Sequence, residues 1–283
     1  MIFGLLSSSN GGCVVSIKKF RLFAPFILIA LIFLFGFLVI GSPFESLFYP
    51  VTFVATLTLQ VVTNMSFKSL GMDFPLGWKK STLAYYNAAL LLVTFHVVVS
   101  IVIGGLLISV MSVLTPEAIG FVLMAQVAQF IVGFFEEYSF RGYMLAATEL
   151  YGRRTSLFIS SISFSLVHVF AIIPYAYPVE SIMVFIFNMF LGGWALGLVR
   201  QKTGSLIPPI AFHASWNFFG YHLYGLMGSD TTFFTTTYLM PDILVKFEFG
   251  FITTIIFAVL ILILSFARAR DQESNQKDHE IGI

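Results

Sequence analysis

Residues 118–150 read AIGFVLMAQVAQFIVGFFEEYSFRGYMLAATEL, an apolar run long enough to cross a bilayer that carries two adjacent glutamates, Glu136 and Glu137. A helix of about 20 apolar residues spans the hydrocarbon core of a membrane. Each ionisable side chain at the bilayer centre costs roughly 2.5–3.5 kcal/mol, so such residues are rare there and mark functional sites. We therefore predict a membrane-spanning helix. Its two carboxylates are expected either to be paired with positive charges or to take part in the function of the protein.

The composition of the whole chain agrees with a membrane protein. Hydrophobic residues make up 58% of the 283 residues and charged residues only 10%, whereas an average soluble domain is about a quarter charged. The 15 Lys and Arg residues nearly balance the 14 Asp and Glu residues, so the chain lacks the basic field that binding of nucleic acid requires. Its single cysteine, Cys13, excludes an intramolecular disulfide and a metal site built from several cysteines.

Eight apolar stretches predict an all-α bundle of about eight transmembrane helices. Their expected bounds are 24–40, 47–65, 82–110, 118–150, 156–174, 181–199, 206–226 and 247–267. The second stretch is polar enough to be interfacial or re-entrant instead of spanning. The third and fourth are longer than a span needs, so we expect them to tilt or to extend beyond the hydrocarbon. No small-residue cleavage site follows the first stretch, which predicts a retained span and not a signal peptide.

The positive charges predict the orientation of these helices. With eight spans and an internal N-terminus, nearly all Lys and Arg residues fall on one side, with Lys246 on the other and Arg141 within the fourth helix. Because lysine and arginine concentrate in cytoplasmic loops, both termini are predicted to be cytoplasmic. The protein is then a multi-pass integral membrane protein, in the cytoplasmic membrane if its source is bacterial.

The two adjacent glutamates of the fourth predicted helix are expected to have different roles. Glu137 and Arg141 are four residues apart and share a face of the helix, where they can form a charge-assisted pair. Glu136 is rotated by about 100° from Glu137, because a helix has 3.6 residues per turn. One glutamate can thus be held structurally while the other is free to react. The structural alternative is a buried ion pair beside a second glutamate that reaches to water.

Two other predicted helices carry polar side chains one turn apart. Phe164 and His168 share a face of the fifth helix, and His213 and Asn217 share a face of the seventh. From the cytoplasmic ends of their helices, Glu136 lies about 16 residues in, His168 about 12 and His213 about 7 to 9, or roughly 10–24 Å at 1.5 Å per residue. We therefore expect these groups to converge in one cavity in the cytoplasmic half of the bundle.

Three motifs occur in chain order at these positions, namely Glu136-Glu137-Tyr-Ser-Phe-Arg141, Phe164-Ser-Leu-Val-His168 and His213-Ala-Ser-Trp-Asn217. They match the patterns EExxxR, FxxxH and HxxxN. The chain thereby resembles the CPBP family of CAAX proteases and bacteriocin-processing enzymes, also called the Abi family, whose eukaryotic relative is the type II CAAX prenyl endopeptidase. The resemblance covers roughly residues 118–220.

The apolar stretches, the charges and this resemblance together predict five parts of the chain. Residues 1–23 form a cytoplasmic N-terminal segment, 24–117 the first three spans and 118–225 the catalytic core of the CPBP type. Residues 226–267 form an outer loop and the last span, and 268–283 a cytoplasmic polar tail that we expect to be disordered.

The resemblance also implies an intramembrane endopeptidase and a role for each motif residue. Glu136 and His168 would activate the water that attacks a peptide bond. His213 and Asn217 would donate hydrogen bonds to the oxyanion of the tetrahedral intermediate. The architecture of the site would be held by the remaining motif residues, Glu137, Arg141 and Phe164.

Members of the family are often labelled metalloproteases, and the same residues offer a second chemistry. Glu136, His168 and His213 could supply a carboxylate and two imidazoles to zinc, with a fourth position open for water. The sequence leaves glutamate-activated water and metal-bound water as alternatives.

The sequence lacks the residues that other mechanisms of intramembrane proteolysis require. The sequence has no HExxH motif and no GxSxG-like turn, and every aspartate falls outside the predicted spans. His96 and His222 lie in apolar stretches without a matched polar neighbour, so we interpret them as packing or interfacial residues.

The predicted substrate is a lipid-anchored or membrane-associated protein or peptide that reaches a cytoplasm-facing cavity. Two alternatives come from other classes of protein. The first is a non-catalytic membrane scaffold or immunity-type protein, against which the intact motifs argue. The second, less favoured, is a transporter with a proton relay along the buried acids and histidines, against which the lack of a repeated half argues.

Overall fold

The structure is a computed structural model that describes residues 12–43, 47–110, 115–173, 175, 177–227 and 233–281. It is 77% helical, in agreement with the predicted helical class, and it adds one small sheet. Residues 1–11 of the predicted N-terminal segment lie outside the described residues.

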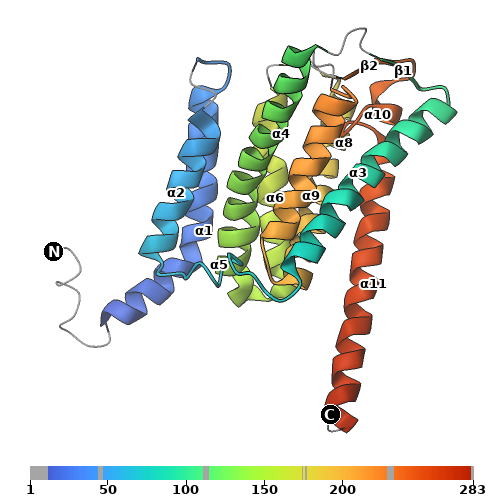
Figure 1. The fold of residues 1–283 in the computed structure, drawn as a ribbon. Coiled ribbons are helices and arrows are strands. Elements are labelled where there is room, and N and C mark those ends of the chain that lie inside the picture. Colours follow the sequence, from blue (N-terminus) through green and yellow to red (C-terminus); the bar gives the residue numbers. More distant parts are fainter. Residues whose placement is uncertain are drawn as a thin grey trace.

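The long helices run up and down in a bundle (Figure 1). Their bounds are α1 Gly12–Val39, α2 Phe48–Val62, α3 Trp78–Val102, α4 Pro116–Glu137, α6 Arg153–Val167, α8 Val179–Thr203, α9 Ile207–Asn217 and α11 Phe251–Ile281. The short helices between them are α5 Leu145–Thr148, α7 Val169–Ile172 and α10 Asp242–Val245. α1 and α2 pair at one side of the bundle, while α4 packs on α9 and α6 packs on α8 at its centre (Figure 1).

Several described helices are apolar enough for a membrane protein. By length and composition, three could cross a bilayer, and they are Trp78–Val102, Pro116–Tyr151 and Val179–Thr203. The shorter apolar helices are Phe23–Val39, Phe48–Val62 and Phe251–Phe266. The predicted fifth span forms α6 and α7, and the predicted seventh forms α9 and the π-helical segment Phe218–Leu223. Both α6 and α9 are shorter than a span needs, and α6 carries several buried serines. The count of eight spans and the orientation therefore stay predictions.

The predicted third span is too long at its C-terminal end. α3 ends at Val102, and Gly104 follows in a left-handed backbone conformation with a φ of 72°, which a residue without a Cβ adopts readily. Beyond it, β1 (Leu106–Val110) pairs antiparallel with β2 (Phe234–Tyr238). This sheet joins two segments far apart in sequence at one end of the bundle (Figure 1).

The last apolar stretch is followed by more helix and not by a disordered tail. α11 continues without interruption to Ile281, so the expectation of disorder is wrong for the described part of the tail. The segment contains Ala, Arg, Gln, Glu and Lys, which have high intrinsic helix propensity. These residues can extend a helix that the preceding apolar stretch has already started.

Gly133 lets α4 and α9 approach each other closely. A Cβ at this position would lie 3.5 Å from the backbone nitrogen of Ala214 and 3.5 Å from the carbonyl oxygen of Ile210. Glu136 lies about one turn further along α4, and His213 directly precedes Ala214 on α9. A Cβ would make ordinary van der Waals contact at these distances, so a side chain much larger than that of alanine would push apart two helices that carry predicted site residues.

Replacing Gly133 with leucine should separate α4 from α9. Overpacking of this kind costs about 1–3 kcal/mol, so we expect a lower melting temperature of the detergent-purified protein. Gly120→Leu is the matched control on the same helix, because nothing lies within 4 Å of a Cβ at that position. Equal melting temperatures for the two variants would contradict the close approach.

Candidate active site

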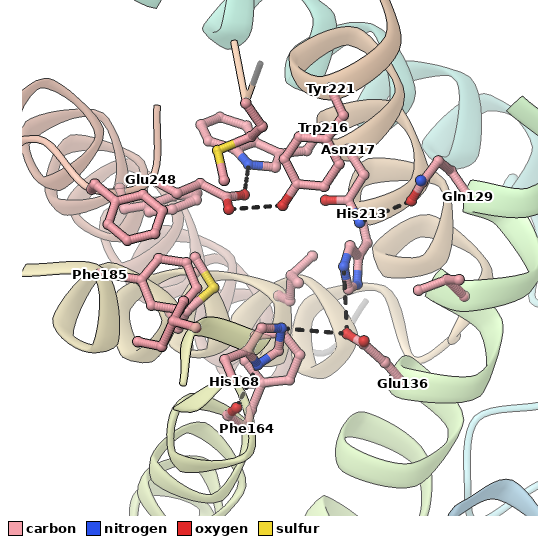
Figure 2. A pocket seen from close by; sticks show the side chains of 18 of the residues that line it. Gln129, Glu136, Phe164, His168, Phe185, His213, Trp216, Asn217, Tyr221 and Glu248 are labelled. Carbon is pink, nitrogen blue, oxygen red and sulfur yellow. Dashed lines mark hydrogen bonds and ion pairs between the residues drawn. The ribbon is translucent and has the colours of Figure 1, made fainter. Parts of the chain in front are cut away.

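A cavity of about 690 Å³ inside the bundle is lined by all four predicted catalytic residues, Glu136, His168, His213 and Asn217. Their side chains reach it from α4, from the end of α6 and from α9 (Figure 2). Apolar and aromatic side chains form much of the remaining wall, as is typical of sites that bind organic ligands. Three motifs that are separate in sequence therefore meet at one place.

Two π-helical segments begin directly after the motif residues Glu137 and Asn217. α4 ends at Glu137 and continues as η2, Tyr138–Met144, while α9 ends at Asn217 and continues as η4, Phe218–Leu223. π-Helical turns are rare, and they occur frequently at functional sites. The helical register thus changes within the first motif, directly after Glu137, and immediately after the third motif.

Glu136 lies at the centre of the cluster. Its Oε2 atom is 3.6 Å from Nε2 of His213 and 3.9 Å from Nε2 of His168. Both distances exceed hydrogen-bonding range, and this buried oxygen has no hydrogen-bonding partner in the part of the chain that the structure describes. An unpartnered buried oxygen is unfavourable, so it is an obvious place for a further molecule to bind.

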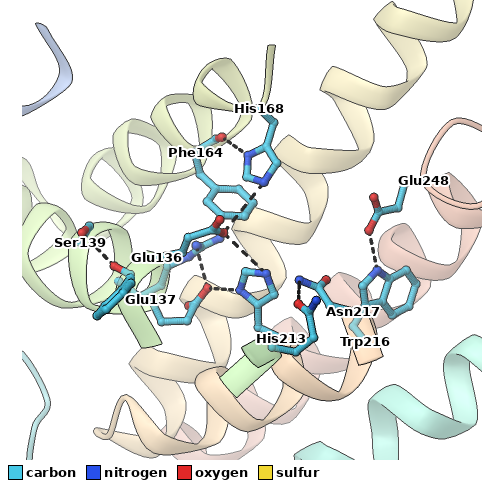
Figure 3. Close-up of polar contacts among 12 residues, drawn as sticks. Glu136, Glu137, Ser139, Phe164, His168, His213, Trp216, Asn217 and Glu248 are labelled. Carbon is cyan, nitrogen blue, oxygen red and sulfur yellow. Dashed lines mark hydrogen bonds and ion pairs between the residues drawn. The ribbon is translucent and has the colours of Figure 1, made fainter. Parts of the chain in front are cut away.

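Hydrogen-bond acceptors determine how the two imidazoles are oriented. Nδ1 of His168 donates to the carbonyl oxygen of Phe164 at 2.7 Å, and Nδ1 of His213 donates to Oε1 of Glu137 at 2.9 Å (Figure 3). A carbonyl and an ionised carboxylate only accept hydrogen bonds, so each Nδ1 carries a proton. Both Nε2 atoms are left facing Glu136.

Glu137 is fully buried and joins two partners. Its Oε1 accepts a hydrogen bond from Nη1 of Arg141 at 2.9 Å as well as the bond from His213. The guanidinium of Arg141 lies 4.0 Å from the ring centroid of Phe164, a cation–π contact. The pair that the spacing of Glu137 and Arg141 predicts is therefore present, and it orients His213.

Asn217 is held by a chain of hydrogen bonds whose other members lie outside the three motifs. Its Nδ2 donates to Oε1 of Gln129 at 3.1 Å, and Nε2 of Gln129 lies 3.0 Å from Nε2 of His222. His222, interpreted from the sequence as a packing or interfacial residue, is thus connected to the site. His96, in contrast, is a buried packing residue whose Nε2 lies 3.0 Å from the carbonyl oxygen of Val245.

The cavity lies nearer the end of the bundle that carries the β1–β2 sheet than we expected. α6 has only 15 residues and His168 follows its last residue, so this histidine lies at the far end of the helix. The wall also includes Tyr175 and Tyr177, which connect α7 to α8, and Met227, which follows η4. These connections lie opposite the C-terminus of α11 (Figure 1). The cavity thus extends toward the end of the bundle that carries the sheet, and its opening toward the cytoplasm stays a prediction.

The zinc alternative can be compared with the same geometry. Two imidazoles and a carboxylate are the ligand types of a catalytic zinc site. Within the described ranges, however, no group of three or more His, Cys, Asp or Glu side chains is arranged so that it could hold a metal ion. The geometry therefore does not support a metal site formed by Glu136, His168 and His213.

One acidic residue on the cavity wall is missing from the sequence prediction. Glu248 lies between α10 and α11, and its carboxylate accepts hydrogen bonds from Nε1 of Trp216 at 3.0 Å and from the hydroxyl of Tyr221 at 2.7 Å. The sequence contained a signal for it, because an acidic residue at the start of the predicted last span is unusual. Gln129 gave no comparable signal.

Comparison with known proteins agrees with the three motifs. Residues 118–219 match the family model described as type II CAAX prenyl endopeptidase Rce1-like. The predicted resemblance is thereby confirmed, and the Rce1-like match supports a CAAX-type peptidase in the membrane. The matched region contains all three motifs. No curated protein matches the chain.

Glu137 and Arg141 should be needed for folding. Removing either residue leaves its partner as a buried, uncompensated charge, which costs about 3–5 kcal/mol. We expect Glu137→Ala and Arg141→Ala to lower the melting temperature of the purified protein strongly. Glu136→Gln is the matched control, because it changes the neighbouring carboxylate without breaking that pair. A Glu137→Ala protein as stable as the Glu136→Gln protein would contradict this role.

Proposed function

We propose that this protein is an intramembrane endopeptidase that hydrolyses a peptide bond in a lipid-anchored or membrane-associated protein or peptide. The observation that carries the proposal is the buried Oε2 of Glu136, which faces Nε2 of His168 and Nε2 of His213. Atoms separated by 3.6–3.9 Å leave room for one water that bonds to two of them at once. Such a water is held beside a base.

In the first step, Glu136 acts as the general base. It takes one proton from the water, while Nε2 of His168 accepts a hydrogen bond from the other hydrogen and orients the molecule. The water oxygen then attacks the carbonyl carbon of the scissile peptide bond. A positioned general base contributes about 10²–10⁴-fold to the rate.

His213 and Asn217 donate hydrogen bonds to the oxyanion that forms. To donate from Nε2, His213 carries protons on both ring nitrogens, and the carboxylates of Glu136 and Glu137 lie one beside each nitrogen. They are suitable partners for such a cation. Asn217 has two N–H groups, and Gln129 uses one of them, so the other is available to the oxyanion.

Collapse of the tetrahedral intermediate completes the reaction. Glu136 returns its proton to the leaving nitrogen, the C–N bond breaks, and the products are a carboxylic acid and an amine. One water has been added, and Glu136 is ionised again. The two imidazoles end in the protonation states in which they began.

The proposed substrate follows from the wall of the cavity and from the family. Phe164, Phe185 and Phe249 are among the aromatic side chains of the wall, and they suit an apolar peptide or lipid-modified chain. The Rce1-like match favours CAAX-type cleavage near the anchored end of the substrate. We further propose that the bilayer delivers the substrate to the bundle.

Cleavage of a membrane-anchored peptide library by the detergent-purified wild type tests the proposed function. We expect cleavage that Glu136→Gln lowers about 10²–10⁴-fold and that 1,10-phenanthroline leaves intact. Loss of activity with the chelator and recovery with zinc would instead show a metal-dependent reaction. No cleavage by the wild type, with Glu136→Gln protein keeping the cellular phenotype, would favour a non-catalytic scaffold.

Asn217→Ala should lower kcat about 10²–10³-fold, since it removes one donor to the oxyanion. KM should change little, because the donor acts mainly in the transition state. Ser215→Ala is the matched control, because Ser215 lies on the same helix but donates to the carbonyl oxygen of Tyr86. A change in KM alone for Asn217→Ala would argue against an oxyanion donor.

A further inference from the structure

Glu248 is a buried acid that the proposed reaction does not use. It lies between α10 and α11, is only 3% exposed and lines the same cavity as Glu136. Figure 2 shows the two carboxylates on opposite sides of the cavity, with Trp216 and Tyr221 beside Glu248. An ionisable side chain at such a place requires a partner or a function.

The partners of the Glu248 carboxylate are both uncharged. Trp216 donates to Oε1 and Tyr221 donates to Oε2. Two carboxylate oxygens offer about four acceptor positions, so each oxygen can accept a further hydrogen bond. Among the ion pairs formed by described residues, none includes Glu248, whereas Glu137 has Arg141. Glu248 is thus an acid of the cavity wall that forms no direct ion pair with a described residue.

The backbone at Glu248 is held in an unusual conformation. Its φ is 62°, in the left-handed region that few residues other than glycine adopt. Nδ2 of Asn188 donates to the carbonyl oxygen of Glu248 at 2.8 Å, and the Glu248 N–H donates to Oγ1 of Thr253 at 3.3 Å. Residues held in this way cluster at ligand sites. These contacts fix the direction of the carboxylate.

We propose that Glu248 is a specificity residue that binds a lysine or arginine side chain of the peptide substrate. The inference rests on the proposed function and adds a charge requirement to it. A buried carboxylate is unfavourable without a cation, and an ammonium or guanidinium group supplies donors for its free acceptor positions. The rings of Trp216 and Tyr221 beside it are suitable surfaces for the same cation.

A purely structural role for Glu248 would have different consequences. Its two donors belong to α9 and η4, the elements that carry His213 and Asn217 or follow them. If the carboxylate only fixed those elements, its loss would slow cleavage of every peptide to the same degree. A substrate-binding role makes the loss depend on the charge of the peptide.

The test compares palmitoylated peptides that carry lysine, acetyl-lysine or glutamate at one position, scanned along the residues around the cleaved bond. Acetylation removes the charge of lysine and keeps its chain. We expect kcat/KM of the wild type to be about tenfold or more higher for lysine than for acetyl-lysine at one position. Glu248→Gln, which keeps the shape, should bring this ratio close to one.

Two results would overturn the inference. One is equal cleavage of the lysine and acetyl-lysine peptides by the wild type at every position, a comparison that needs no variant. The other is a Glu248→Gln protein that slows all peptides equally and keeps the lysine preference. If Glu248→Gln fails to fold, the cleavage of the lysine and acetyl-lysine peptides by the wild type decides the inference alone.

A binding measurement tests this inference independently of the proposed function. Fluorescence anisotropy with Glu136→Gln protein measures the affinity for the same lysine and acetyl-lysine peptides without cleavage. We expect Glu136→Gln protein to bind the lysine peptide more tightly than the acetyl-lysine peptide, and the Glu136→Gln, Glu248→Gln double variant to bind both equally. This result supports the inference even where the wild type cleaves nothing. Cleavage by the wild type without a charge preference would retain the proposed function and reject the inference.

Discussion

The buried carboxylate of Glu137 is the interaction on which the site depends. Its Oε1 accepts hydrogen bonds from Arg141 one turn later and from His213 on α9, so one oxygen connects two helices. All three side chains are buried, where removing one partner of a charged pair leaves the other charge uncompensated and is strongly destabilising. This set fixes the imidazole of His213, and through it the position of the second helix relative to Glu136.

Two adjacent glutamates therefore have opposite environments. Glu137 is fully buried and its Oε1 is paired with Arg141 and His213. Oε2 lacks a hydrogen-bonding partner among the described residues in both glutamates, but only Glu136 lines the cavity. Different surroundings commonly give two carboxylates of one site different roles. The α-helix ends at this pair and π-helical η2 begins, so the pair lies at a change of helical register.

Part of the site could be predicted from the spacing of residues along one helix. The rest depends on contacts between residues that are far apart in the sequence. The pairing of Glu137 with Arg141 was predictable, because residues four apart on a helix are neighbours. The contacts of Gln129 with Asn217 and of Glu248 with its donors join different elements, so no local pattern predicts them. The β1–β2 pairing is equally long-range. The helical class was predictable from composition. The number of spans was not, because a short helix with several buried serines, such as α6, cannot be recognised as a span from its length and hydropathy.

The central claim is that the carboxylate of Glu136 activates water for peptide hydrolysis, and chemical rescue tests it most directly. The measurement is cleavage of a membrane-anchored reporter peptide by Glu136→Ala protein over a range of formate concentrations, with 1,10-phenanthroline present. We predict no cleavage without formate and a rate that rises with formate, because formate places a carboxylate in the vacated space. Cleavage by Glu136→Ala protein at the wild-type rate without formate would contradict the claim.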